Sequence, residues 1–283
     1  MKSISTSLVQ HLIAAQFPQY AHLPISPVPF GGHDNRTFHL GPDMSIRLPS
    51  GAAYAPKVEK EQYWLPKLAP FLPLPIPKPI AMGKPSADYP YQWSIYSWIE
   101  GETASVDHIS DMTKFATDLA SFLKALHKID TTGGLVAGAH NFYRGGPLRT
   151  YDSEIQHALA LTQDKSYAKK VTRLWEAALS STWQGAPIWV HGDVAIGNLL
   201  VKDGHLAAII DFGGMGIGDP ACDLVIAWTF LKGQCRAVFQ KALPFDEAMW
   251  IRARGWALWK AFCHPVEGQE EEAQRVIHEA LEA

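Results

Sequence analysis

The stretch Ile188–Gly214 constrains the fold of this 283-residue chain more than any other. Its sequence is IWVHGDVAIGNLLVKDGHLAAIIDFGG, with apolar runs at residues 188–190, 198–202 and 205–210. Asp203-Gly204 lies between the last two runs, and Asp-Gly is a strong hairpin signal because a type I′ turn needs positive φ at both central residues. We therefore predict a strand that leads into a β-hairpin.

Three polar residues lie where these strands should end. Asp193 follows the first strand, Asn198 begins the second, and Asp211 closes the third. The hairpin should place Asn198 beside Asp211, and the lead-in strand should bring Asp193 near both. Two carboxylates and an amide suit a divalent cation with oxygen ligands next to a general base. The alternative is that these residues only cap the strand ends, where Asp and Asn are common.

The spacing of these residues resembles a known family. His191-Gly192-Asp193, then Asn198, then Asp211-Phe212-Gly213, is similar to the catalytic loop and metal-binding motif of the protein-kinase-like superfamily. Gly192 stands where protein kinases carry Arg. This HGD form is typical of the aminoglycoside phosphotransferase family, the small-molecule branch of that superfamily.

The resemblance implies a two-lobed α+β fold. Residues 1–100 would form an N-terminal nucleotide-binding lobe with an antiparallel sheet and one helix, and residues 101–283 a mainly helical lobe for catalysis and acceptor binding. By the same resemblance, Asp193 would accept the proton of the acceptor hydroxyl, while Asn198 and Asp211 would hold Mg²⁺. ATP or GTP would donate the γ-phosphoryl group.

Several candidate nucleotide contacts lie in the first hundred residues. Gly31, Gly32 and Asn35 fall in a turn between β-prone runs, where backbone N–H groups can approach phosphates. A Gly-Gly pair is equally an ordinary turn, and G-x-G-x-x-G is absent. The resemblance also places the adenine against the backbone of Ser97 and Ile99, just before the lobe boundary near Gly101.

The strand 44–48 carries Arg47 where kinases have a phosphate-binding Lys. Arg keeps the charge but differs from Lys in reach and geometry, so Arg47 either contacts the nucleotide or faces solvent. Its partner on the following helix would be Glu61, with Glu59 as the alternative.

The helices are expected from periodicity and capping residues. The expected ranges are 3–17, 110–128, 152–180 with a break near Asp164, 221–231, 246–263 and 265–282. Asp223 on the fourth of these resembles a structural Asp of the family. The Pro-rich run 70–79 should be extended.

Composition excludes some classes of function. The formal net charge of −3 argues against a nucleic-acid-binding surface. No apolar run approaches the roughly 18 residues of a membrane span, and the N-terminus does not resemble a signal peptide. The three cysteines, none in C-x-x-C, suggest reduced thiols in a cytoplasmic protein. The resemblance implies a nucleotide and a small-molecule acceptor as partners, and the oligomeric state is open.

The acceptor is not determined by the sequence. An acidic group, Glu267, Glu270, Glu271 and Glu272, would suit a cationic aminoglycoside, although Glu is also common at a solvated helix N-terminus. Trp228, Trp250, Trp256 and Trp259 could line a site for a macrolide or simply form core. A kinase of choline, homoserine or a sugar is a further alternative.

Two other functional classes are alternatives to a small-molecule kinase. A nucleotide-binding protein without transfer activity is conceivable because of Arg47 and the loose glycine turn. A protein kinase is disfavoured, because Asp219-Pro220 follows soon after Asp211 and leaves no room for a long activation segment. Zinc-ligand spacing and a G-x-S-x-G hydrolase motif are absent.

Overall fold

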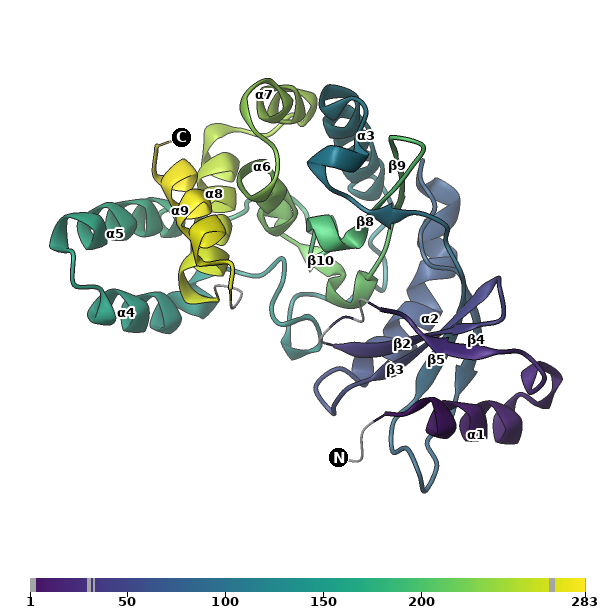
Figure 1. The fold of residues 1–283 in the computed structure, drawn as a ribbon. Coiled ribbons are helices and arrows are strands. Elements are labelled where there is room, and N and C mark those ends of the chain that lie inside the picture. Colours follow the sequence, from purple (N-terminus) through teal and green to yellow (C-terminus); the bar gives the residue numbers. More distant parts are fainter. Residues whose placement is uncertain (1–3, 30–31, 33, 265–267, 283) are drawn as a thin grey trace. The chain divides into compact units, whose positions relative to one another are not determined.

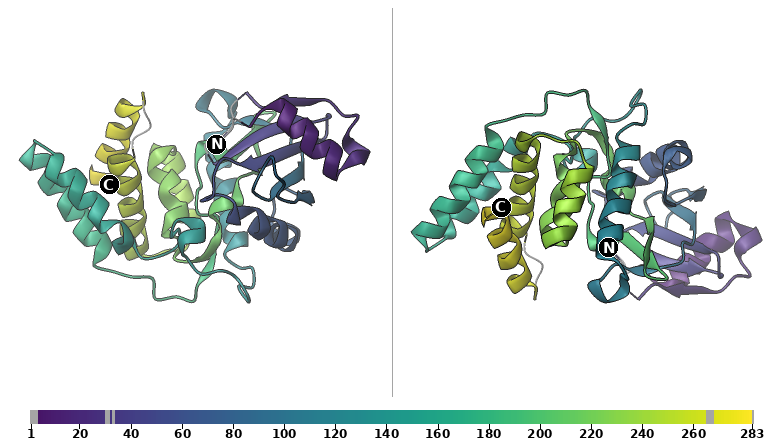
Figure 2. Two further views of the ribbon diagram at one scale, coloured as in Figure 1. Left: turned by 90° about the horizontal axis from the view of Figure 1, so that it is seen from below. Right: turned by 90° about the horizontal axis from the view of Figure 1, so that it is seen from above.

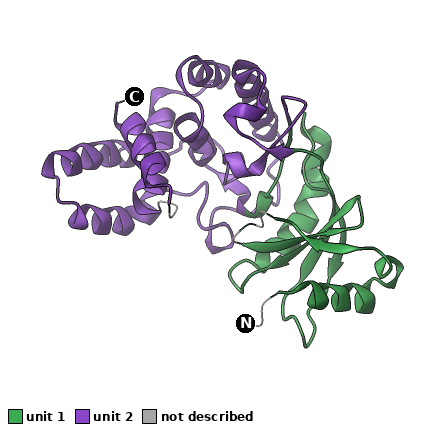
Figure 3. Cartoon of the chain, in the orientation of Figure 1, with its two compact units in different colours: residues 1–101, 207–213 green, residues 102–206, 214–283 purple. Residues whose placement is uncertain are grey.

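The computed structural model describes residues 4–29, 32, 34–264 and 268–282. The chain divides into two compact units (Figure 3). Unit 1 comprises residues 1–101 and 207–213, and unit 2 comprises residues 102–206 and 214–283. No helix in the described parts is long and apolar enough to cross a membrane.

Unit 1 is built on a five-stranded antiparallel sheet (Figure 1). Its order is β1-β2-β3-β5-β4. The strands are β1 (Ile25–Pro27), β2 (Asn35–Leu40), β3 (Met44–Pro49), β4 (Pro79–Gly83) and β5 (Trp93–Ser97). Phe38, Ile46 and Ile95 are paired across three neighbouring strands and are buried. Because side chains alternate between the two faces of a strand, this register gives the sheet a continuous apolar face.

Two helices accompany this sheet. Helix α1 (Thr6–Gln16) begins at Ser5, whose side chain accepts from the Leu8 amide, and its buried residues share one core cluster with the strands. Helix α2 (Pro56–Leu68) packs against β4 and β5 and carries Glu61. The run 70–79 starts in a short 3₁₀ helix, Ala69–Phe71, then contains no helix and enters β4 at Pro79, so the expectation that it is not an α-helix is confirmed.

The strands of unit 2 include the predicted hairpin. They are β6 (Glu102–Thr103), β7 (Ile188–Val190), β8 (Leu199–Lys202), β9 (His205–Ile209) and β10 (Gly216–Gly218). Strand β10 pairs with β7 and β6 with β8, and β9 runs across the division between the units. Asp203 and Gly204 have φ of 52° and 79° at the turn between β8 and β9. These positive values are what a type I′ turn requires, so the hairpin prediction is confirmed.

Helices make up most of unit 2. Helices α5 and α9 both pack on α8, and α7 packs on α3 (Figure 2). The helices are α3 (Met112–Leu126), α4 (Asp152–Leu161), α5 (Lys165–Leu179), α6 (Ile226–Thr229), α7 (Gly233–Ala242), α8 (Glu247–Cys263) and α9 (Glu270–Glu282). The antiparallel sheet of unit 1 and the helical unit 2 confirm the α+β fold class.

Some expected helices differ in detail. The break near Asp164 is confirmed, since its side chain caps α5 by accepting from the amides of Ser166 and Tyr167. The expected helix 221–231 is instead a 3₁₀ helix, Pro220–Val225, followed by the single turn of α6. Helix α7 was not expected. Helix α9 begins at Glu270, and residues 265–267 lie outside the described residues.

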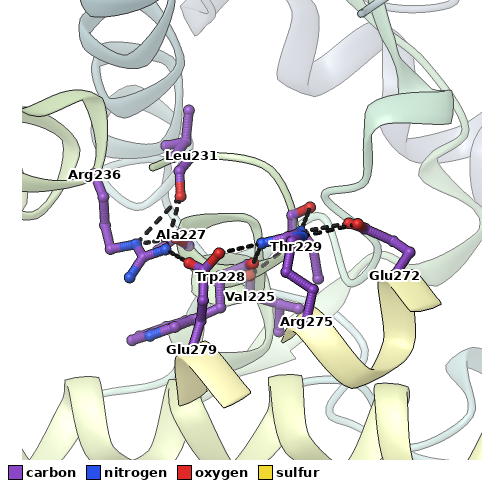
Figure 4. Close-up of polar contacts among 9 residues, drawn as sticks. All are labelled: Val225, Ala227, Trp228, Thr229, Leu231, Arg236, Glu272, Arg275 and Glu279. Carbon is purple, nitrogen blue, oxygen red and sulfur yellow. Dashed lines mark hydrogen bonds and ion pairs between the residues drawn. The ribbon is translucent and has the colours of Figure 1, made fainter. Parts of the chain in front are cut away.

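Two arginines cap the C-terminal end of α6 (Figure 4). Arg275 donates to the carbonyl oxygens of Trp228 and Thr229, and Arg236 donates to those of Ala227 and Leu231. Glu279 forms an ion pair with both guanidinium groups. Since the last carbonyls of a helix have no partner within it, these contacts explain how so short a helix ends inside the unit.

Candidate active site

The loop after β7 is held by a buried carboxylate. Asp223 is fully buried, and its two oxygens accept from the amides of His191 and Gly192, each at 2.7 Å. Burial raises the Asp223 pKa above its ordinary value, although the two amide donors oppose that rise. Asp223 therefore fixes the backbone that leads into Asp193, which agrees with the structural role expected for it.

Gly192 has a conformation that excludes a side chain. Its φ is +84°, and a Cβ atom built there would lie 2.1 Å from the carbonyl oxygen of Gly214. Backbone cannot move away as a flexible side chain can. The HGD form is therefore a geometric requirement of this loop, and Arg at this position would not fit.

The Asp193 carboxylate has a partner on each oxygen. Asn198 donates its side-chain amide to Oδ2 of Asp193 at 3.1 Å and to the Asp193 carbonyl at 2.9 Å. Lys260, on α8, donates to Oδ1 at 2.9 Å. The Asp193 side chain is still 44% exposed, so a ligand can reach it.

The charge state of Asp193 suits a general base. Partial burial pushes its pKa upward, but Lys260, His191 and Arg144 outweigh this and the pKa lies below the ordinary value. An ionised carboxylate can orient a hydroxyl and take its proton.

In unit 1, Arg47 contacts two carboxylates. Its guanidinium lies 3.6 Å from Oε1 of Glu61 and 3.1 Å from Oδ1 of Asp211. Burial alone would lower the Arg47 pKa, but the charges of Asp211 and Glu61 raise it above its ordinary value. Arg47 thus faces the interior of unit 1 rather than solvent, and Glu61, not Glu59, is its partner on α2.

The segment around Asp211 is closely held within unit 1. Asp211 has φ of +62°, a left-handed conformation that Asp tolerates better than most residues. Lys60 of α2 is buried and donates to the Gly213 carbonyl at 2.9 Å. Burial lowers the Lys60 pKa to about 7. Lys60 is thus a second basic side chain of unit 1 beside the Asp211-Phe212-Gly213 motif.

The expected glycine turn is only partly described. Gly31 lies outside the described residues, Gly32 is exposed, and Asn35 begins β2. Next to them, Asp34 forms an ion pair with Lys57 of α2 at 2.5 Å. The nucleotide contacts expected of Gly31, Gly32 and Asn35 stay predictions.

The two expected adenine contacts differ in their local structure. The Ser97 amide donates to the Lys78 carbonyl at 2.9 Å, so this N–H is not available to a nucleotide. Ile99 follows the end of β5 and lies outside any strand. Of the two residues, Ile99 is therefore the better candidate for an amide contact.

The structure groups the predicted residues within each unit. Asp193 and Asn198 meet in unit 2, and Arg47, Glu61 and Asp211 meet in unit 1. The expected meeting of Asn198 with Asp211 involves residues of different units and stays a prediction.

Sequence reasoning missed two lysines of this site. Lys260 is the lone cation in the apolar run Trp256–Phe262, and such an isolated charge is the signal that could have identified it. Lys60 directly precedes Glu61 on α2 and is buried with it, which periodicity alone does not reveal.

The Asn198 side chain is compatible with a magnesium ion that phosphates and water also coordinate. Among the described residues no group of three or more His, Cys, Asp or Glu side chains could hold a metal. Magnesium usually takes only one or two protein ligands together with phosphates and water. Asn198 turns its amino group to Asp193, so its side-chain carbonyl oxygen points elsewhere and suits a cation.

Comparison with known proteins agrees with this geometry. Residues 25–262 match the model of a phosphotransferase enzyme family. An aminoglycoside 3'-phosphotransferase from Escherichia coli is 28% identical over 209 residues, which cover 71% of this chain and 73% of that protein.

Solved structures share the fold. The GDP and kanamycin complex of APH(2")-IIia has a TM-score of 0.77 at 20% identity, covering 97% of this chain and 96% of that one. Macrolide 2'-phosphotransferase MphH from Brachybacterium faecium has a TM-score of 0.64 at 20% identity, with 97% of each chain covered. Since the family model spans most of the sequence and includes both motifs, the chain belongs to the phosphotransferase enzyme family.

Proposed function

We propose that this small-molecule phosphotransferase transfers the γ-phosphoryl group of ATP or GTP to a hydroxyl of a small molecule, with Asp193 as the general base. The observation that carries the proposal is the Asp193 carboxylate. It is ionised, oriented by Asn198 at 3.1 Å and still accessible. A carboxylate held in this way can align an acceptor hydroxyl for attack.

The nucleotide and the metal belong to the same proposal. Relatives with this fold have been solved with GDP or ATP. Arg47, with its charge beside Asp211, is the residue of unit 1 that we expect to contact the phosphates, and Glu61 holds its guanidinium in place. Asn198 and Asp211 would hold Mg²⁺. When bound, Mg²⁺ offsets the negative charge that develops on the phosphates.

Antibiotics are the first acceptors to test. The curated relative is an aminoglycoside 3'-phosphotransferase, and the structural relatives include gentamicin and streptomycin complexes as well as macrolide phosphotransferases. An aminoglycoside or a macrolide is therefore the acceptor class that the relatives support.

A metabolite kinase is a second candidate, favoured by the charges around Asp193. In the acidic group that was expected to attract a polycation, the carboxylate of Glu272 already forms an ion pair with Arg275. Lys260 instead brings a cation to Asp193 itself. This arrangement suits acceptors other than polycations.

The test is nucleotide consumption in Mg²⁺ with pooled acceptors, comparing the wild type with Asp193→Ala. The pools are aminoglycosides, macrolides, amino alcohols, hydroxy acids and sugars. Acceptor-dependent turnover should fall by at least ~10²-fold in the variant, because general-base catalysis is lost. Nucleotide affinity, measured by calorimetry, should be largely unchanged. A variant that keeps the full rate would refute the role of Asp193.

A further inference from the structure

Two cations flank Asp193 in unit 2. Lys260 lies 2.9 Å from Oδ1 of Asp193. Arg144 lies beside the same loop, since a Cβ built on Gly192 would be only 3.1 Å from the Cβ of Arg144. The charge of Arg144 also contributes to the lowered pKa of Asp193, which agrees with this proximity.

The loop Gly138–Gly146, here called the Arg144 loop, holds Arg144 in a fixed backbone conformation. Asn141 is fully buried, donates its side-chain amide to the Arg144 carbonyl at 2.9 Å and accepts from the Gly138 amide at 3.0 Å. Phe142 and Tyr143 have φ of 53° and 58°. Consecutive left-handed residues with bulky side chains are costly and persist only where the surroundings enforce them, often at functional sites.

The guanidinium of Arg144 lies on aromatic rings instead of on a carboxylate. Its central carbon is 4.7 Å from the ring centroid of Trp259 and 5.4 Å from that of Trp256. No ion pair of Arg144 is recorded among the described residues. Stacking on tryptophan orients the planar fork while leaving its N–H groups for a ligand, and that fork matches the geometry of carboxylates and phosphates.

An acidic side chain beside Trp259, Glu154, is already engaged. Glu154 accepts from Nε1 of Trp259 at 2.9 Å and contacts Nε2 of His264 at 2.7 Å. Beside Asp193, the guanidinium of Arg144 therefore forms no ion pair with a carboxylate in the described parts of the chain, and the ammonium group of Lys260 is partly exposed.

We propose that Arg144 and Lys260 form a cationic anchor for an anionic group, a carboxylate or a phosphate, carried by the acceptor near its reacting hydroxyl. The inference rests on the phosphotransferase activity proposed above and narrows its substrate class. A hydroxy acid, a sugar acid or a sugar phosphate fits this anchor. A polycationic aminoglycoside or choline would bring like charge to it, which opposes binding.

The test measures binding of matched hexoses by calorimetry at constant ionic strength. The probes are D-glucose, D-glucuronate, D-glucose 6-phosphate and D-glucosamine, with kanamycin as the polycation. At least one anionic hexose should bind about tenfold more tightly than glucose, as expected for a charge-assisted contact, and glucosamine and kanamycin more weakly. Glucuronate and glucose 6-phosphate separate a carboxylate site from a phosphate site.

Variants of Arg144 and Lys260 test whether the cationic anchor causes the preference for anionic hexoses. Arg144→Gln should remove the anionic preference, whereas Arg144→Lys should keep part of it. Arg149→Gln is the matched control, because Arg149 is exposed in the following 3₁₀ helix and should leave all affinities unchanged. Lys260→Gln should weaken anion binding and strengthen kanamycin binding.

Four results would overturn the inference: equal affinity for charged and neutral hexoses, no binding of any hexose at millimolar concentration, tightest binding of kanamycin to the wild type, or an anionic preference that survives Arg144→Gln. The proposed function is judged separately by Mg²⁺-dependent nucleotide consumption and its loss in Asp193→Ala. Turnover of kanamycin alone would thus refute the anchor but not the phosphotransferase activity.

Discussion

At the scale of single residues, Gly192 has a backbone conformation that excludes a side chain in the loop before Asp193. Gly192→Ala would need positive φ for a residue with a Cβ, which costs about 1–2 kcal/mol, and would force that Cβ against the Gly214 carbonyl. We expect a loss of unfolding free energy of at least about 2 kcal/mol, together with most of the activity. Urea unfolding and nucleotide consumption measure both.

A second glycine of the same loop is the control for this prediction. A Cβ on Gly197 would meet nothing within 4 Å, and Gly197 has no positive φ. Gly197→Ala should therefore leave the unfolding free energy within about 0.5 kcal/mol of the wild type. Equal stability of both variants would contradict the geometric requirement at Gly192.

Arg47 contacts two carboxylates of unit 1, so its charge should contribute to the stability of that unit. Arg47→Met would remove the guanidinium group that contacts the carboxylates of Glu61 and Asp211. Removing one partner of a buried pair costs about 3–5 kcal/mol of unfolding free energy. Adding Glu61→Gln to Arg47→Met should recover part of this loss, and a double-mutant cycle by urea unfolding measures the coupling. A coupling energy near zero would mean that the pair does not stabilise unit 1.

At the scale of elements, the end of α3 carries a histidine that makes stability depend on pH. Burial lowers the His127 pKa to about 4, and its Nε2 is buried without a hydrogen-bond partner in the described parts of the chain. In the unfolded chain the pKa returns to about 6.5. Between these values the unfolded state binds more protons, so stability is complete above the unfolded pKa and falls as the pH drops toward about 4.

His127→Leu should remove this contribution. Between pH 7.5 and pH 5 the wild type should lose about 2 kcal/mol more unfolding free energy than the variant, in proportion to the pKa difference crossed. His205→Leu, at an exposed position of β9, should behave like the wild type. If His127→Leu and the wild type show the same pH dependence in urea unfolding, His127 is not the source.

Elements fixed by local chemistry were predictable from the sequence. The Asp203-Gly204 turn and the Asp164 cap depend on residues close in sequence, and the structure confirms both. The Pro220–Val225 segment was mistaken for an α-helix, because apolar composition does not separate α from 3₁₀ geometry. Helix α7 was missed, since only one of its residues, Phe239, is buried and the apolar stripe is correspondingly weak.

At the scale of the whole molecule, only candidate site residues that belong to a sequence motif could be predicted. The motifs predict Asp193, Asn198 and Asp211 as site residues, but nothing in the sequence indicates that residues 207–213 belong to unit 1 with Arg47. Lys260 and Arg144 were missed because they reach Asp193 from distant parts of the chain. Such contacts leave no periodic pattern in the sequence.

The proposed magnesium ligands, Asn198 and Asp211, can each be tested by thermal unfolding. Asn198 belongs to unit 2 and Asp211 to unit 1. Binding of a non-hydrolysable ATP analogue with Mg²⁺ at a hundred times its Kd should stabilise the native protein by about 2.7 kcal/mol. Chelation by EDTA should remove the Mg²⁺-dependent part of the rise in Tm.

If both residues bind the metal, Asn198→Ala and Asp211→Asn should each lose that part of the rise in Tm, each compared with its own metal-free Tm. Gly197→Ala is the control for a substitution next to Asn198. It keeps both proposed ligands and should retain the full Mg²⁺-dependent increment in Tm. An Asn198→Ala variant that also retains it would show that Asn198 is not a metal ligand.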